Sequence, residues 1–98
     1  MSESKEHKMA KEKAAGKRGR TEVPLKGGRR LDALNEDRAT EVERSGSRKL
    51  IKKALSRLEE VARKKKELHV PIKDLAKARK SAKNHPVVVK EIRTKKLA

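Results

Sequence analysis

The sequence predicts an α/β (α+β) protein with a small mixed β-sheet of about four strands flanked by helices. First, 98 residues are enough for one small domain and too few for two. Second, helical and alternating patterns of apolar residues follow one another along the chain. Third, residues 67–92 contain a strand pattern, a basic helix pattern and a second strand pattern, which is typical of a crossover between parallel strands.

The N-terminal part, residues 1–20, is expected to form a basic helix and a turn. Residues 2–15 are rich in helix formers and carry acidic residues near their start, and the segment GKRGR at 16–20 indicates a turn. Residues 21–25 then form a short extended piece, in which Pro24 disfavours a central position in a sheet.

A β-hairpin is predicted next, after a turn at Gly27 and Gly28. Its strands are residues 29–34 and 38–44, joined by a turn at 35–37. Because side chains alternate between the faces of a strand, we expect these groups to share a face: Leu31 with Ala33, and Ala39 with Glu41 and Glu43.

The clearest element is an amphipathic helix over residues 48–64, with a capping residue in the preceding segment 45–47. One continuous apolar stripe runs along it, formed by Leu50, Ile51, Ala54, Leu55, Leu58, Val61 and Ala62.

The C-terminal third contains an edge strand, a helix and a second strand. In the first strand, 67–72, the apolar residues are Leu68, Val70 and Ile72, and Pro71 favours an edge position. Asp74 is expected to cap the helix that follows. The remaining expected segments are a helix at 73–83, a strand at 87–92 and a loose basic tail at 93–98.

The composition points to a polyanionic partner. Thirty lysines and arginines against fourteen acidic residues give a net charge of +16. The chain has no cysteine, which excludes disulfides and thiolate zinc sites, and no long apolar run, which argues against a membrane partner. It has no aromatic residue, which argues against binding of RNA or single strands by base stacking. We therefore expect an intracellular protein of the cytoplasm or nucleoid that binds nucleic acid, with DNA favoured over RNA.

An acidic island interrupts the positive charge. Residues 31–47 hold five acids and two arginines, whereas the flanking segments 1–30 and 48–98 are both strongly basic. One interpretation is a solvated acidic loop that forms salt bridges. The other is a cation site within a nucleic-acid surface, because Mg²⁺ and Mn²⁺ take carboxylate and phosphate oxygens as ligands.

Asp32 and Glu41 are the candidate pair for such a site. A turn near residues 35–37 brings the two side chains opposite or diagonal to each other, about 5 Å apart at Cβ. Carboxylates this close repel each other unless they share a proton or a cation. The alternative is a charged, solvent-facing side of the hairpin with arginine partners.

The stretch GGRRLDALNEDRATEVERSGS resembles the core of the PD-(D/E)XK nuclease superfamily, and the chain looks similar to small archaeal-type endonuclease and junction-resolvase domains. The resemblance implies an αβββαβ core and Mg²⁺- or Mn²⁺-dependent hydrolysis of phosphodiesters. Asp32 and Glu41 match the motif Asp and Glu, and would be catalytic and metal-binding. Glu6 matches the Glu that the first helix supplies in that family.

One motif position departs from the family pattern. Where the resemblance implies Lys, this chain has Glu43. A carboxylate can ligate metal or accept a proton, so Glu43 is a third catalytic candidate, but it cannot supply positive charge. The alternative is an inactive site on a fold that still binds nucleic acid.

Phosphate binding is assigned to basic residues of the two later helices and of the turn before the hairpin. These residues are Arg29, Arg30, Arg48, Lys49, Lys52, Lys53, Arg57, Lys77 and Lys80.

Three functions remain open. The first is a metal-dependent endonuclease, with a homodimer expected because the core is thin. The second is a non-enzymatic basic protein of a ribosome or nucleoid. The third is an inactive nuclease-fold module that only binds nucleic acid.

Overall fold

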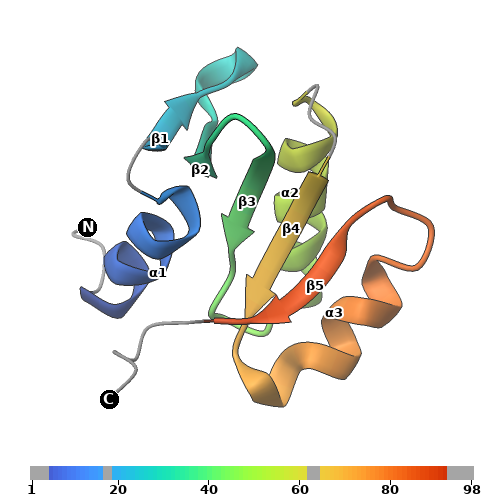
Figure 1. Ribbon diagram of the computed structural model, residues 1–98. Helices are drawn as coiled ribbons and strands as arrows, with labels where there is room; N and C mark the ends of the chain where they lie inside the picture. The colour runs from blue at the N-terminus through green and yellow to red at the C-terminus, as the bar shows by residue number, and fades with distance from the viewer. Residues whose placement is uncertain (1–4, 17–18, 62–64, 93–98) are drawn as a thin grey trace.

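The computed structural model describes residues 5–16, 19–61 and 65–92, and the predicted tail at 93–98 lies outside these residues. It confirms a mixed α/β fold with one five-stranded sheet and three α-helices (Figure 1). The elements are α1 (Lys5–Ala15), β1 (Arg20–Pro24), β2 (Arg30–Leu34), β3 (Arg38–Val42), α2 (Arg48–Glu59), β4 (Lys65–Val70), α3 (Leu75–Ser81) and β5 (Val88–Glu91). Short 3₁₀ turns at Lys26–Gly28 and Ile72–Asp74 precede β2 and α3.

The strand order across the sheet is β1-β2-β3-β4-β5. The first three strands are antiparallel neighbours, and β4 and β5 then add in parallel. The expected crossover through residues 67–92 is therefore confirmed. The short extended piece at 21–25 is a fifth strand, and Pro24 lies in it at the sheet edge, where a missing backbone donor is tolerated.

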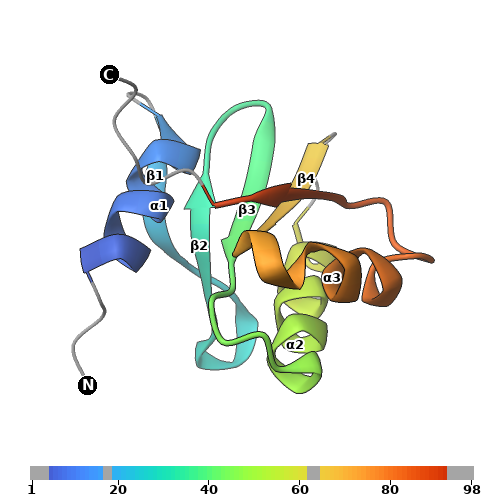
Figure 2. The same cartoon turned by 90° about the horizontal axis from the view of Figure 1, so that it is seen from below.

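The sheet separates two layers of different character. Helices α2 and α3 cover one face, and α1 covers the other (Figure 2). The main core lies under α2 and α3 and is built of leucine, isoleucine, valine and alanine. Under α1 the apolar contact is small, and consists of Ala14 and Ala15 against Ala33. Most of the apolar burial is thus on the α2 side.

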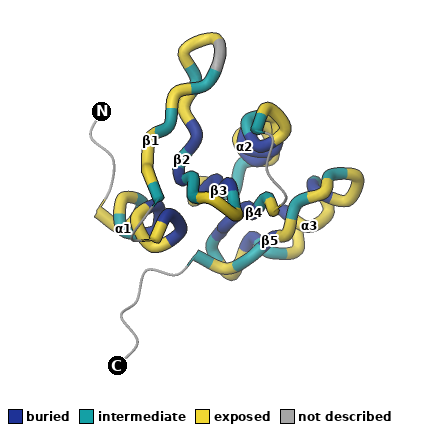
Figure 3. The backbone as a smooth tube through the Cα atoms, turned by 45° about the horizontal axis from the view of Figure 1, so that its top comes forward, coloured by how far each residue is buried: buried dark blue, intermediate teal, exposed yellow. Residues whose placement is uncertain are grey.

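The apolar stripe of α2 explains this asymmetry. Ser47 caps the helix by accepting a hydrogen bond from the Leu50 backbone N–H at 3.4 Å, and the stripe then buries Ile51, Leu55 and Leu58. The predicted stripe is wrong at its start, because Leu50 is 36% exposed. Figure 3 shows the buried side of α2 facing the sheet and the exposed tip of the β1–β2 hairpin.

The prediction that Leu31 and Ala33 share a face is wrong. Leu31 packs into the core under α2, whereas Ala33 packs against α1. In β1, Thr21 pairs with Ala33 and Val23 with Leu31, and Glu22 between them has a positive φ of 53°. The β1–β2 hairpin therefore rotates about its long axis at Glu22 and Asp32. The half that includes its turn faces α2.

The prediction that the strand at 67–72 lies at the sheet edge is wrong, because β4 pairs with β3 on one side and with β5 on the other, and Pro71 follows its last residue. Other expectations need correction at element ends. Ile72 is 67% exposed, because β4 ends at Val70 and the chain turns at Pro71. Asp74 precedes α3, but its side chain makes no capping hydrogen bond. Both later helices are shorter than predicted, since α2 ends at Glu59 and α3 spans only Leu75–Ser81. The predicted positions 62–64, including Ala62 of the apolar stripe, lie outside the described residues. Among the described residues, no helix is long and apolar enough to cross a membrane.

Candidate functional site

Asp32 and Glu41 meet where the pairing of β2 and β3 ends. The recorded pairs are Leu34 with Ala39 and Ala33 with Thr40, so Asp32 and Glu41 come next in register. Here side chains take over from the backbone carbonyls as acceptors. The Asp32 backbone N–H donates to Glu41 Oε2 at 2.8 Å, and the Val42 backbone N–H donates to Asp32 Oδ2 at 2.7 Å. The predicted proximity of the two residues is therefore present.

Glu41 points into the protein. Its side chain is fully buried, and its Oε1 accepts a hydrogen bond from Arg57 Nε of α2. Burial, followed by the negative charge of Asp32, raises the pKa of Glu41 from 4.5 to about 8, and the charge and hydrogen bond of Arg57 oppose the rise. Both carboxylate oxygens are thus engaged within the protein.

Asp32 turns toward the other helix layer. Its Oδ1 lies 3.6 Å from Nε2 of His7 on α1, and its side chain is 15% exposed. Although Asp32 and Glu41 are neighbours in register, one contacts α1 and the other contacts α2. The rotation of the hairpin at Asp32 accounts for this divergence, since it changes the face to which the side chain points.

The other two acidic candidates lie apart from this pair. Glu6 forms an ion pair with Arg44, at 3.3 Å between Oε2 and Nη1. Glu43 accepts a hydrogen bond from the Ser45 backbone N–H at 3.2 Å. Within residues 5–16, 19–61 and 65–92, no three Asp, Glu or His side chains form a group that could hold a metal ion. A divalent ion between Asp32 and Glu41 would have to bind Glu41 through Oε2, because Arg57 holds Oε1.

Most of the predicted phosphate-binding residues are exposed. Four of them lie along the outer side of α2 and two on α3: Arg48, Lys49, Lys52, Lys53, Lys77 and Lys80. No acidic partner is recorded for any of these six in the part of the chain that the structure describes. Lys77 donates to the backbone oxygen of Gly46 at 2.7 Å. We call these six residues the basic surface.

Two of the predicted phosphate contacts have structural partners instead. Arg57 holds Glu41, and Arg29 forms an ion pair with Glu60 and donates to Ser56 at 3.3 Å. Arg29 thereby fastens the hairpin to α2. Arg30 is exposed at the start of β2, next to this contact.

Sequence reasoning missed two partners of the acidic pair. His7 is not among the residues that the sequence singled out, and Arg57 is predicted only as a phosphate contact. No local signal identifies either, because each contact joins segments at least 16 residues apart. Sequence reasoning also missed Glu67 and His69, although the alternation of residues along β4 could have identified them. They alternate along β4 with Leu68 and Val70, so they share the face opposite the main core.

Comparison with known proteins gives no match to a protein-family model, a curated protein or a solved structure.

Proposed function

We propose that the protein binds nucleic acid, with duplex DNA favoured over RNA, through the basic surface of α2 and α3. The observation that carries this proposal is the set of exposed cations on adjacent helices that have no acidic partner among residues 5–16, 19–61 and 65–92. Unpaired cations repel one another, so the surface gains free energy when phosphates approach it. The absence of aromatic side chains favours backbone contacts over base stacking.

Salt dependence of duplex binding tests this proposal. If about 6–8 phosphates are contacted, log K should fall with log[salt] with a slope of roughly −5 to −7. Replacing Lys52 and Lys53 with Gln should reduce the magnitude of that slope by about 2. The matched control replaces Lys5 and Lys8 of α1 with Gln, because this removes the same charge from the opposite layer. Equal losses in both variants would show attraction to net charge alone and contradict a defined surface.

A second candidate is a divalent-metal-dependent endonuclease, and the meeting of Asp32 with Glu41 favours it. The order α1, β1–β3, α2, β4 is also the order that the resemblance to PD-(D/E)XK nucleases implies. In such an enzyme Mg²⁺ or Mn²⁺ supplies charge stabilisation and an activated water. Asp32 is the more accessible ligand, with Oδ2 held by the Val42 N–H and Oδ1 facing His7.

Calorimetric titration of Mg²⁺ and Mn²⁺ separates the two candidates, alongside a nicking assay on linear and branched DNA. An endonuclease should lose metal binding and cleavage in the variant with Asp32→Asn and Glu41→Gln, while DNA binding persists. DNA binding without metal binding in the wild type would instead support a nuclease-like fold that is used only for binding. The ion pair of Glu41 with Arg57 and the carboxylate at Glu43 favour that alternative. A basic structural protein of a ribosome or nucleoid would give the same result as an inactive nuclease-fold module.

A further inference from the structure

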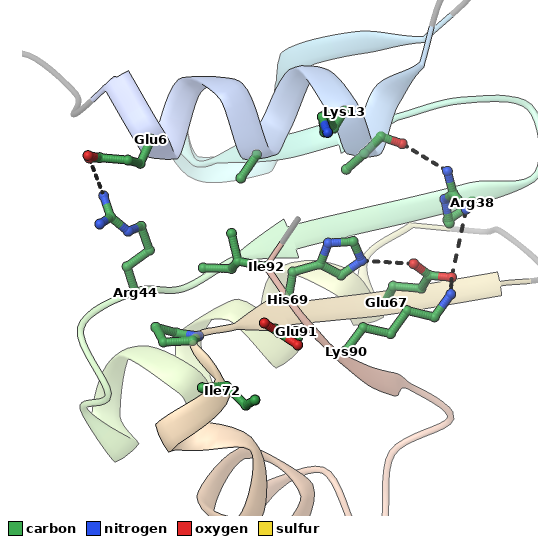
Figure 4. Close-up of a pocket in the computed structure, with 13 residues that line it drawn as sticks. Glu6, Lys13, Arg38, Arg44, Glu67, His69, Ile72, Lys90, Glu91 and Ile92 are labelled. Atoms are coloured by element: carbon green, nitrogen blue, oxygen red, sulfur yellow. Dashed lines mark hydrogen bonds and ion pairs between the residues drawn. The ribbon is translucent and has the colours of Figure 1, made fainter. Parts of the chain in front are cut away.

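A cavity of about 720 Å³ lies between α1 and the sheet, on the layer opposite the basic surface (Figure 4). Ala10, Lys13 and Ala14 of α1 line one side, and charged residues of β3, β4 and β5 line the other. Cavities of about 300–1,000 Å³ accept small organic ligands. Asp32, Glu41 and Glu43 do not line it, so it is separate from the site discussed above.

A buried charged cluster forms the floor of the cavity. Glu67, 6% exposed, lies 2.8 Å from His69 Nε2, 3.0 Å from Lys90 Nζ and 3.9 Å from Arg38 Nη1. Burial alone would raise the pKa of Glu67, but the hydrogen bonds and charges of its neighbours outweigh burial and lower it. Burial lowers the pKa of His69, so the ring is neutral at pH 7. The cluster is therefore one anion between two cations.

Such a cluster is costly in a protein with so little apolar core. Buried ion pairs seldom add stability compared with apolar residues of similar size. Arg38 also retains a buried Nε without a hydrogen-bond partner in the described structure, and Lys90 has three donors of which one contacts Glu67. The remaining Lys90 donors are at hand for a further anion, and the buried Arg38 Nε shows that the polar groups beside the cavity are not fully paired within the described structure.

The two ends of the cavity differ. Lys13, Arg38 and Lys90 lie toward the end near Glu67 (Figure 4). Ile72 and Ile92 lie toward the other end, which the Glu6–Arg44 ion pair also lines. Phosphate oxygens match the first end, since lysine and arginine are the usual phosphate ligands. A flat ring with apolar faces and polar edges, such as a nucleobase, matches the second, where isoleucine side chains lie beside an ion pair.

We propose that this cavity binds a nucleoside monophosphate, with the phosphate at Lys90, Arg38 and Lys13 and the base against Ile72 and Ile92. A sugar phosphate would set hydroxyl groups against the isoleucines, and inorganic phosphate would leave that end unfilled. The proposal does not rest on nucleic-acid binding by the basic surface, because the two sites lie in opposite layers.

NMR titration of the ¹⁵N-labelled protein with AMP, adenosine and inorganic phosphate tests the proposal. AMP should shift the amide signals of Ala10, Ala14, His69 and Ile92 and saturate. Adenosine and phosphate should each bind at least about tenfold more weakly, because each fills one end. Phosphate that binds as tightly as AMP would overturn the assignment of a nucleotide. Shifts confined to α2, or no saturation, would overturn the site.

Single-charge variants provide the matched comparison. Lys90→Gln should weaken AMP binding at least about tenfold, and Lys52→Gln on α2 should leave it within about twofold. Circular dichroism verifies that each variant is folded. If Lys90→Gln does not fold, Lys13→Gln replaces it as the test, with the same expected loss of AMP affinity, because Lys13 lines the cavity at an exposed position of α1. Wild-type affinity in a folded Lys90 or Lys13 variant would overturn the proposal.

Discussion

The guanidinium of Arg57 on α2 holds the carboxylate of Glu41 on β3 inside the protein, 16 residues earlier in the chain. Glu41 is fully buried, while Arg57 is 23% exposed and lies on the helix that carries the basic surface. The contact therefore connects the acidic pair on β2 and β3 with α2, the helix that is proposed to bind nucleic acid. Arg57 therefore has a structural partner, and Glu41 lies in the interior of the protein.

Arg57→Met should destabilise the fold by about 1–3 kcal/mol at pH 7, because it leaves Oε1 of the buried Glu41 carboxyl group without its hydrogen-bond donor. Urea unfolding followed by far-UV circular dichroism measures this loss. Arg48→Met removes a cation from the exposed face of the same helix and should change stability by less than about 0.5 kcal/mol.

A double variant tests whether Arg57 acts through Glu41. Adding Glu41→Leu to Arg57→Met removes the buried carboxyl group that has lost its donor, so the double variant should be more stable than Arg57→Met alone. A double variant that is weaker than either single variant would show that Arg57 stabilises the fold through packing rather than through Glu41.

Glu41 should make the wild type less stable as pH rises. The pKa of Glu41 is about 8 in the folded protein and 4.5 in the unfolded chain. Between these pH values the folded chain therefore binds one proton more than the unfolded chain. Stability from this group is fully present below pH 4.5 and is lost toward pH 8. Relative to Glu41→Gln, the wild type should lose more than about 1 kcal/mol across this window. Parallel pH profiles in the two proteins would contradict the raised pKa.

His69 should act in the opposite direction. Burial lowers its pKa from 6.5, and the nearby cations Lys90 and Arg38 add to this, while Glu67 opposes it. Below pH 6.5 the unfolded chain takes up a proton that the folded chain does not, so stability falls as pH falls. The lowered pKa of Glu67 adds a further acid-induced loss below pH 4.5. His69→Gln should lessen the loss between pH 6.5 and 5, as measured by urea unfolding against wild type.

Leu58→Ala should cost about 2–5 kcal/mol, because Leu58 is fully buried in the core between α2 and the sheet. Leu50→Ala on the same helix removes a side chain that is 36% exposed, and should cost less than about 1 kcal/mol. Equal losses would contradict the orientation of α2 on the sheet. Urea midpoints of the two variants settle this comparison.

Gly46→Ala should destabilise the loop before α2. Gly46 has a φ of 74°, and a Cβ there would lie 2.9 Å from Oδ1 of the buried Asp74. The expected loss is about 2–3 kcal/mol, from backbone strain plus the clash. Gly28→Ala is the control, since φ is 75° but a Cβ meets nothing within 4 Å. It should therefore show the strain alone, about 1–2 kcal/mol.

The sequence by itself determines the α/β class, the order of the elements and the separation of charge. Apolar spacing defines α2, because it shows which side of the helix is buried, and a run of β-branched residues defines β5. The acidic island and its pair, Asp32 and Glu41, also follow from the sequence, since a hairpin joins residues close in the chain.

Only the tertiary structure decides what these residues contact. The rotation of the hairpin at Asp32 separates Leu31 from Ala33 and directs Asp32 to His7, and a repeat of two residues along a strand cannot reveal such a rotation. The Glu41–Arg57 pair joins a strand to a helix, and the charged floor under α1 joins three strands. These contacts depend on how the layers pack. Local sequence therefore determines the elements and their charge, whereas packing over long chain separations determines the partner and the pKa of each buried charge.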